Sequence, residues 1–112
     1  MAVLKFRACV SWGEGYRMIY SFQEEFQHYF AHDMNSISIM QCSGIKDKNG
    51  AEIYESDILK VNNELYISHW DDRNARFILD CIKNNKTFDN FREMVKSGEV
   101  IGNVAENPDL LQ

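Results

Sequence analysis

Two histidines and a glutamate in the N-terminal part of the chain have a spacing that could form a metal site. His28 and His32 are four residues apart, and Glu24 precedes them by one helical turn, so all three would share one face of a helix. Imidazole and carboxylate groups are ligands for zinc or a similar ion. However, the glutamate of a zincin motif is absent and no fourth ligand is evident. The pattern is more typical of the solvated side of an amphipathic helix, so we predict no bound metal and no cofactor.

A second group of ionisable residues surrounds Trp70, where His69 precedes it and Asp71 and Asp72 follow it. An imidazole titrates near neutrality and could form an acid–base pair with a carboxylate. Neighbouring residues on a strand point to opposite faces, however, which argues against their cooperation. Residues 47–52 lack the leading acid and the distant glutamate of a calcium loop, which favours a plain turn. Since P-loop, dinucleotide and nucleophile-elbow motifs are also absent, the sequence predicts a protein that is not an enzyme.

Aromatic residues offer a third possibility, because many of them lie on predicted strands or near turns. On a small barrel such side chains can form a shallow groove for a peptide or for stacked bases. Burial in the core is the alternative for most of them. We single out Tyr54 and Trp70 as candidate binding residues, together with Lys46 and Lys48. The full aromatic set is Trp12, Tyr16, Tyr20, Tyr54, Tyr66 and Trp70.

The first third of the chain predicts a hairpin followed by a helix. Residues 4–10 alternate apolar and polar side chains, residues 11–15 contain two glycines, and residues 16–20 resume the strand pattern. Ser21 and Glu24 then have the spacing of a capping box at the start of a helix. The aromatic face of that helix comprises Phe22, Phe26, Tyr29 and Phe30.

The rest of the chain predicts short strands that form a meander and close into a small barrel. Expected strands cover residues 37–42, 58–61, 64–70 and 75–82, and Asn62-Asn63 is a two-residue hairpin turn. Thr87 is the expected cap of a second helix, which ends at Gly98, and a closing strand covers residues 100–104. We therefore predict a mainly β protein of the α+β class with two short helices.

Length and charge limit the possible functions. A chain of 112 residues is one domain, or one domain with a small appended piece, and we place the division after residue 36. The net charge of −5 disfavours non-specific nucleic-acid binding, which needs a basic excess. Cys9, Cys42 and Cys81 contain no paired motif and are interpreted as reduced, buried cysteines. No apolar run is long enough for a membrane span, and nothing at the N-terminus indicates export.

Three blocks of the sequence resemble the YopX family of small phage and prophage proteins. The first comprises residues 4–8 and 18–20, the second residues 40–50, 52–55 and 57–58, and the third residues 100–104 and 106–111. The resemblance implies an SH3-type barrel in residues 37–112, a smaller N-terminal part, a phage or prophage origin and a bacterial cytoplasm. It supplies no catalytic residues. Ser56 stands where the family usually has glycine, and Cys42-Ser43 where an aromatic residue and threonine are common.

Three hypotheses on function follow. The first is a non-catalytic interaction module whose barrel and first helix bind a host or phage protein, with possible homo-oligomers formed through exposed strand edges. The second is nucleic-acid binding through a barrel groove, and the third is a small hydrolase or metal enzyme, which rests only on His28 and His32. The backbone contacts expected under the second hypothesis are Lys5, Arg7, Arg17, Lys46, Lys48 and Lys60.

Overall fold

The structure is a computed structural model that describes residues 5–12, 15–20 and 36–111. The chain divides into two compact units, Met1–Cys42 and Ser43–Gln112. The division thus follows Cys42, whereas the sequence suggests one after residue 36. The predicted first helix, with Glu24, His28 and His32, lies outside the described residues. Within the described part, no helix is long and apolar enough to cross a membrane.

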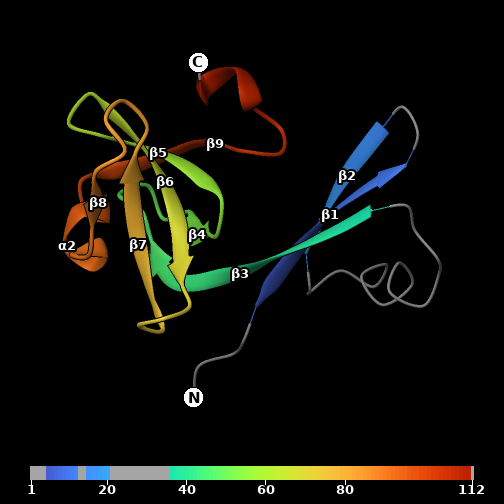
Figure 1. Ribbon diagram of the computed structural model, residues 1–112, viewed down its shortest axis with the longest axis horizontal. Helices are drawn as coiled ribbons and strands as arrows, with labels where there is room; N and C mark the ends of the chain where they lie inside the picture. Colours follow the sequence, from blue (N-terminus) through green and yellow to red (C-terminus); the bar gives the residue numbers. More distant parts are fainter. Residues whose placement is uncertain (1–4, 13–14, 21–35, 112) are drawn as a thin grey trace. The chain divides into compact units, whose positions relative to one another are not determined.

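The first unit contains the predicted N-terminal hairpin (Figure 1). Strand β1 (Phe6–Trp12) pairs antiparallel with β2 (Gly15–Tyr20) on one side and with β3 (Ser36–Lys46) on the other. Its alternation is visible in the burial of Ala8 and Val10, which are 1% and 0% exposed. Strand β3 continues along the chain into the second unit, where it neighbours β4 (Glu52–Tyr54).

The second unit is built around a five-stranded antiparallel sheet with the order β8-β7-β6-β5-β9 (Figure 1). Its strands are β5 (Asp57–Val61), β6 (Glu64–Asp71), β7 (Arg76–Cys81), β8 (Thr87–Phe88) and β9 (Gly98–Asn103). The predicted turn at Asn62-Asn63 is confirmed, and both residues have the positive φ of a type I′ hairpin, 50° and 69°. The sheet forms a half-barrel, so the predicted mainly β, barrel-like fold is confirmed at that level.

The core of the second unit lies between this sheet and the single α-helix that the described residues contain, α2 (Phe91–Val95). Helix α2 packs against β5, β7 and β9 and buries Phe91 and Val95. The remaining buried members come mainly from the strands. They are Ile53, Leu59, Val61, Tyr66, Leu79 and Cys81.

The predicted second helix begins later than expected. Thr87 does not cap it, because Thr87 and Phe88 form β8 opposite Asp80 and Leu79 of β7, and the Thr87 hydroxyl donates to Asp80 Oδ1 at 2.8 Å. The cross-strand partner therefore takes the hydroxyl that would have capped a helix. With one α-helix and the 3-10 helix η1 (Pro108–Leu111) in the described residues, the prediction of two short helices is not borne out.

The turn after β3 is organised by one buried carboxylate. Asp47 is 7% exposed, and its Oδ1 accepts hydrogen bonds from the backbone N–H groups of Asn49 and Ala51, both at 2.9 Å. Its Oδ2 accepts from the N–H of Val100 in β9, also at 2.9 Å. The carboxylate that resembled a calcium ligand therefore ties a turn to a strand 53 residues later.

Two further turns are closed in the same way. Between β4 and β5, Ser56 adopts a left-handed φ of 69°, and Asp57 Oδ2 accepts from the N–H of Tyr54 at 2.8 Å. After β9, Asn103 Oδ1 accepts from the N–H of Glu106 at 2.8 Å, while Asn107 Oδ1 accepts from the N–H of Asn103 at 3.2 Å. In all three turns a side-chain oxygen satisfies backbone N–H groups that would otherwise lack a partner.

Candidate binding pocket

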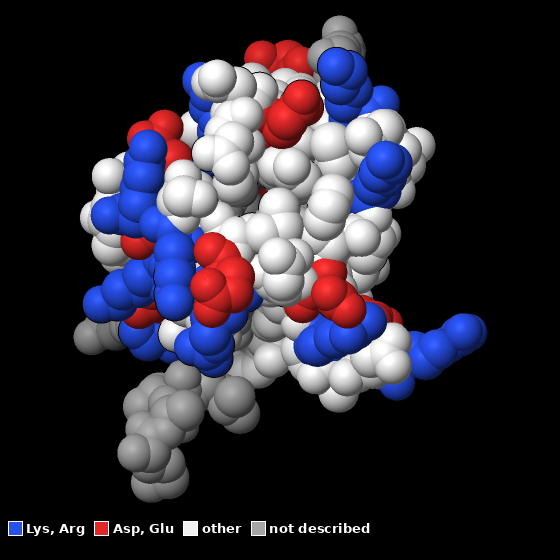
Figure 2. All heavy atoms as spheres, turned by 90° about the vertical axis from the view of Figure 1, so that its left-hand side faces the viewer, with Lys and Arg blue, Asp and Glu red and all other residues white. Residues whose placement is uncertain are grey.

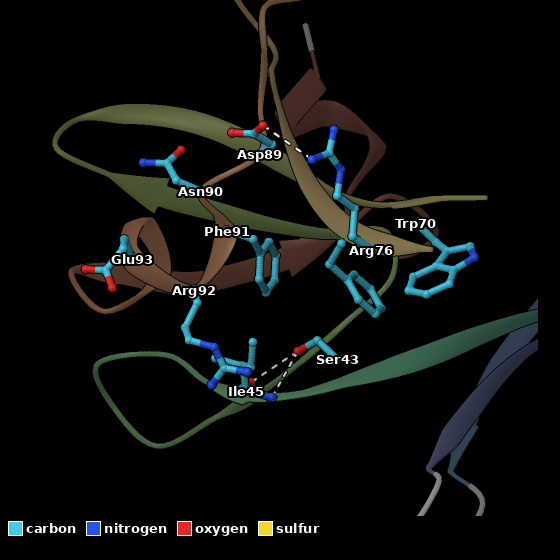
Figure 3. Close-up of a pocket in the computed structure, with 10 residues that line it drawn as sticks. Ser43, Ile45, Trp70, Arg76, Asp89, Asn90, Phe91, Arg92 and Glu93 are labelled. Atoms are coloured by element: carbon cyan, nitrogen blue, oxygen red, sulfur yellow. Dashed lines mark hydrogen bonds and ion pairs between the residues drawn. The ribbon is translucent and has the colours of Figure 1, made fainter. Parts of the chain in front are cut away.

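A pocket of about 350 Å³ opens on the second unit between the C-terminal end of β3, the hairpin of β6 and β7, and the start of α2 (Figure 3). Its volume lies at the lower end of the range for small-ligand sites, which favours a single side chain or a short segment over a large cofactor. The residues that line it are Ser43, Ile45, Trp70, Arg76, Phe77, Asp89, Asn90, Phe91, Arg92 and Glu93.

Three aromatic rings form a continuous row in this pocket. Trp70 of β6 and Phe77 of β7 are cross-strand partners, and their ring centroids lie 5.2 Å apart in a T-shaped arrangement. Phe77 in turn contacts Phe91 of α2, with centroids 5.5 Å apart. Phe91 is buried, whereas Trp70 and Phe77 are half-buried. The row therefore extends from the core to the surface, where its outer rings can contact a ligand.

One side of the pocket carries Arg76, whose positive charge is neutralised by carboxylates of the same chain. Arg76 forms ion pairs with Asp71 and Asp89, with its Nε and Nη1 each 3.3 Å from a carboxylate Oδ2 (Figure 3 shows the second pair). Asn74 Nδ2 also donates to Asp71 Oδ2, at 2.8 Å. The Asn74 amide is the main cause of a lowered pKa for Asp71, and Arg76 lowers it further. Asp71 is thus held ionised beside Arg76.

The other side is made by the C-terminal end of β3 and by α2. Gly44 has a φ of 78°, and Ser43 Oγ accepts from the N–H of Ile45 at 3.1 Å and donates to its carbonyl at 3.3 Å. Arg92 extends from α2 toward Ile45 (Figure 3). Glu93 pairs with Lys96 at 3.5 Å, while Arg92 forms no hydrogen bond or ion pair with any residue that the structure describes.

The predicted binding residues do not form one site. Trp70 lines the pocket, but Tyr54 is only 5% exposed and belongs to the buried residues around β4. Lys46 and Lys48 are exposed on either side of Asp47 and do not line the pocket. The structure thus joins Trp70 to Phe77 and Phe91 instead of to Tyr54.

The residues expected to contact nucleic acid are similarly dispersed. Arg7 is 3% exposed, and its Nε donates to Met40 Sδ at 3.2 Å, so its head is held inside the first unit. Arg17 and Lys60 are exposed. The second unit carries nine Lys and Arg against thirteen Asp and Glu, a net charge of −4. Figure 2 shows basic side chains gathered along the left side of one face, with acidic side chains among and beside them.

The remaining candidates are placed as follows. His69 is exposed on β6, and Asp71 bonds to Arg76 and Asn74. No group of three or more His, Cys, Asp or Glu that could hold a metal occurs among the described residues. Cys9 and Cys42 are half-buried, and Cys81 is buried. The side chains of Trp12 and Tyr16 are not among those described.

Sequence reasoning missed most of the pocket. Phe77 could have been found by folding the predicted hairpin, because a four-residue turn after Asp71 places Phe77 opposite Trp70. Phe91 lies on the buried face of α2, and its contact with Phe77 depends on the tertiary packing of that helix. The exposed position of Arg92 on that helix is likewise a property of the fold.

Comparison with known proteins gives a family and a fold. A family model described as "YopX protein" matches residues 8–112. The crystal structure of protein EF1440 from Enterococcus faecalis is similar over 100% of both chains, with a TM-score of 0.60 and 23% sequence identity. At that identity the similarity shows the fold alone. None of the curated proteins matches the chain.

Proposed function

The chain belongs to the YopX family, and from this premise we propose that it is a non-catalytic protein-interaction module. It would act as a phage or prophage accessory protein in the bacterial cytoplasm and use an SH3-type small barrel to bind a host or phage protein. The contact site in this proposal is the pocket of Trp70, Phe77 and Phe91.

The observation that carries the proposal is the aromatic row, which continues from the core to a half-buried indole. Aromatic rings held by mutual contacts lose little conformational entropy on binding, and they are enriched at the centres of protein interfaces. The polar residues around them form a rim that can exclude water from the contact. This arrangement supports the recognition of an apolar side chain of a partner.

The state of the pocket's polar groups supports binding over catalysis. Ser43 Oγ is bonded to the backbone of Ile45, and Asp89 is paired with Arg76. A hydroxyl nucleophile such as serine needs a general base within hydrogen-bond reach. Among the described residues of this pocket, no such pair is formed, so we propose that the protein is not an enzyme.

The test compares proteins that co-purify with a tagged copy in its bacterial host, with and without nuclease. We expect a stoichiometric protein partner that survives nuclease, is lost in Trp70→Ala and is kept in His69→Ala. His69 is the matched control because it is the exposed neighbour of Trp70 on the same strand and does not line the pocket. Thermal unfolding of both variants separates a lost contact from a lost fold.

Two outcomes would contradict the proposal. A partner retained by the folded Trp70→Ala variant would place the contact elsewhere on the molecule. Recovery of nucleic acid alone, or of partners lost on nuclease treatment, would favour the second hypothesis despite the net charge. Binding to nucleic acid would then weaken steeply with added salt, because phosphate contacts release counterions.

Self-association is part of the same proposal. Strand β8 forms an edge of the five-stranded sheet, and Ile39 on β3 is a large apolar residue that is 52% exposed. Unpaired strand edges and exposed apolar side chains both favour pairing with a second copy. Light scattering over a range of concentrations measures this directly, and a monomer at all concentrations would contradict it.

A further inference from the structure

We infer that the pocket recognises an acidic segment, in which an apolar side chain enters the aromatic row and a neighbouring carboxylate pairs with Arg92. This inference rests on the proposed function and adds the chemistry of the ligand to it.

Four charged side chains line the pocket, and three of them have a partner. Arg76 pairs with Asp71 and Asp89, and Glu93 pairs with Lys96. Arg92 is the fourth, and it has no hydrogen-bond or ion-pair partner among the described residues. Arg92 is therefore the charged group of the pocket with which a ligand could pair while the internal ion pairs stay formed.

The position of Arg92 determines where such a carboxylate would bind. The residue follows Phe91 directly on α2, and its side chain extends toward Ile45 on the opposite wall (Figure 3). It therefore borders the aromatic row without filling it. A guanidinium binds a carboxylate through two parallel N–H donors, which fixes orientation as well as charge. An extended segment could place one side chain against the aromatic rings and the carboxylate of the next residue against the Arg92 guanidinium.

A phosphate could also pair with Arg92, but the rest of the second unit argues against nucleic acid. A nucleic-acid backbone brings several charges, and its affinity comes from neutralising many of them together. Thirteen acidic residues in this unit would repel such a polyanion. A single carboxylate next to an apolar side chain requires only the local cation. We therefore favour a protein segment.

The test uses three blocked peptides that differ at one side chain, acetyl-Gly-Phe-Glu-Gly-amide and its Gln and Lys counterparts. Binding is followed by the indole N–H resonance of Trp70 in a Trp12→Phe background, which leaves one tryptophan. We expect the Glu peptide to bind roughly two- to five-fold more tightly than the Gln peptide, as for an exposed ion pair. The Lys peptide should bind most weakly, and added salt should reduce the Glu preference.

Substitutions then assign the preference to a residue. Arg92→Gln should make the Glu and Gln peptides bind equally, at the level of the Gln peptide with the parent protein. Arg73→Gln makes the same charge change on an exposed turn residue outside the pocket and should keep the preference. A preference lost equally in both variants would reflect net charge alone and would overturn the inference.

The remaining outcomes separate the inference from the proposed function. Equal binding of the Glu and Gln peptides, or tighter binding of the Lys peptide, would overturn the acidic ligand while leaving the pocket as a contact site. If no peptide moves the Trp70 resonance, the inference is wrong, and the co-purification test then decides the proposed function by itself. Tighter binding of a single-stranded thymidine oligonucleotide at Trp70 would overturn both.

Discussion

The signature turns and the aromatic pocket of the second unit use polar side chains in opposite ways. The signature turns are those organised by Asp47, by Ser56 with Asp57, and by Asn103 with Asn107, and there side-chain oxygens bind backbone N–H groups. In the pocket, ion pairs lie at the surface around Arg76, and Arg92 is left for a partner. In the turns the side-chain oxygens are bonded to the backbone, whereas in the pocket the charged side chains are exposed at the surface.

This difference separates the residues that identify the family from those that we propose for function. Eight of the ten pocket residues lie outside the three blocks that resemble the family, and only Ser43 and Ile45 lie inside them. The blocks instead contain Asp47, Asp57, Asn103 and Asn107, whose side chains close the three turns. A family signature of this kind reports the fold, so members could share the turns and present different pockets. We expect stability to depend on the turns and binding to depend on the pocket.

The largest loss of stability is expected from a substitution in the first signature turn, the one that Asp47 organises. Asp47→Ala removes the acceptor of three backbone N–H groups, of Asn49, Ala51 and Val100, and should lower the free energy of unfolding by about 3–4 kcal/mol. Urea unfolding measures the change. Asp47→Asn keeps one carbonyl oxygen and should cost less, while Asp72→Ala, at an exposed acid, should cost little. If the Asp47→Ala protein folds but no longer binds the peptide, the turn residues and the pocket residues do not act independently.

The second-largest loss of stability is expected from a steric clash in the signature turn of Asn103 and Asn107. A Cβ added at Gly102 would lie 2.5 Å from Asn107 Oδ1 and 2.8 Å from its Cγ. Asn107 cannot simply turn away, because its Oδ1 accepts from the N–H of Asn103. Gly102→Ala should therefore cost about 1–3 kcal/mol.

A double-mutant cycle identifies the cause of that cost. Asn107→Ala removes the clashing amide, so the double variant should lose less stability than the two single variants together. Additive losses in chemical denaturation would mean that the close approach of Asn107 is not the cause of the cost at Gly102.

The sequence predicted the framework well where local chemistry decides it. The hairpin of residues 6–20 follows from alternation, and the turn at Asn62-Asn63 follows from two residues that tolerate positive φ. Thr87 was misassigned because a hydroxyl that can cap a helix can equally donate to a neighbouring strand, and only the pairing of β7 with β8 decides between them. Local patterns thus find elements more reliably than their limits.

The pocket was less predictable because it depends on contacts between distant residues. Trp70 was identified by its type and its place near a turn, but the same criterion selected Tyr54, which is buried. Which aromatic residue reaches the surface depends on how β4 and α2 pack on the sheet. The unpaired state of Arg92 depends on ion pairs elsewhere, such as that of Glu93 with Lys96. Neither property is encoded in local spacing.

A smaller effect of opposite sign is expected in the second signature turn. Ser56 has a φ of 69°, a region that costs a non-glycine residue about 1 kcal/mol or more. Ser56→Gly should relieve that cost, less the entropy that glycine adds to the unfolded chain, for a net gain of about 0.5–1 kcal/mol. Ser97→Gly is the matched control, because Ser97 lacks a left-handed φ and should lose stability. If both variants lose stability, Ser56 is not strained.

The smallest effect on stability is expected at the rim of the pocket, from a substitution that shifts the pKa of Asp71. The lowered pKa of Asp71 is due first to the amide of Asn74, so Asn74→Ala should raise that pKa toward the ordinary value of 3.8. Because a depressed carboxyl pKa stabilises the folded state above the unfolded value, the stability that Asn74 contributes should be present near neutral pH. It should disappear as the pH falls through the pKa of folded Asp71.

The carboxyl carbon shift of Asp71, followed by NMR over about pH 2 to 7, measures this pKa. Asn49→Ala is the control, because it removes a comparable amide that is bonded to Glu99. A pKa that stays low in Asn74→Ala would show that Arg76 and the backbone of Asn74 hold the carboxylate ionised without the side-chain amide.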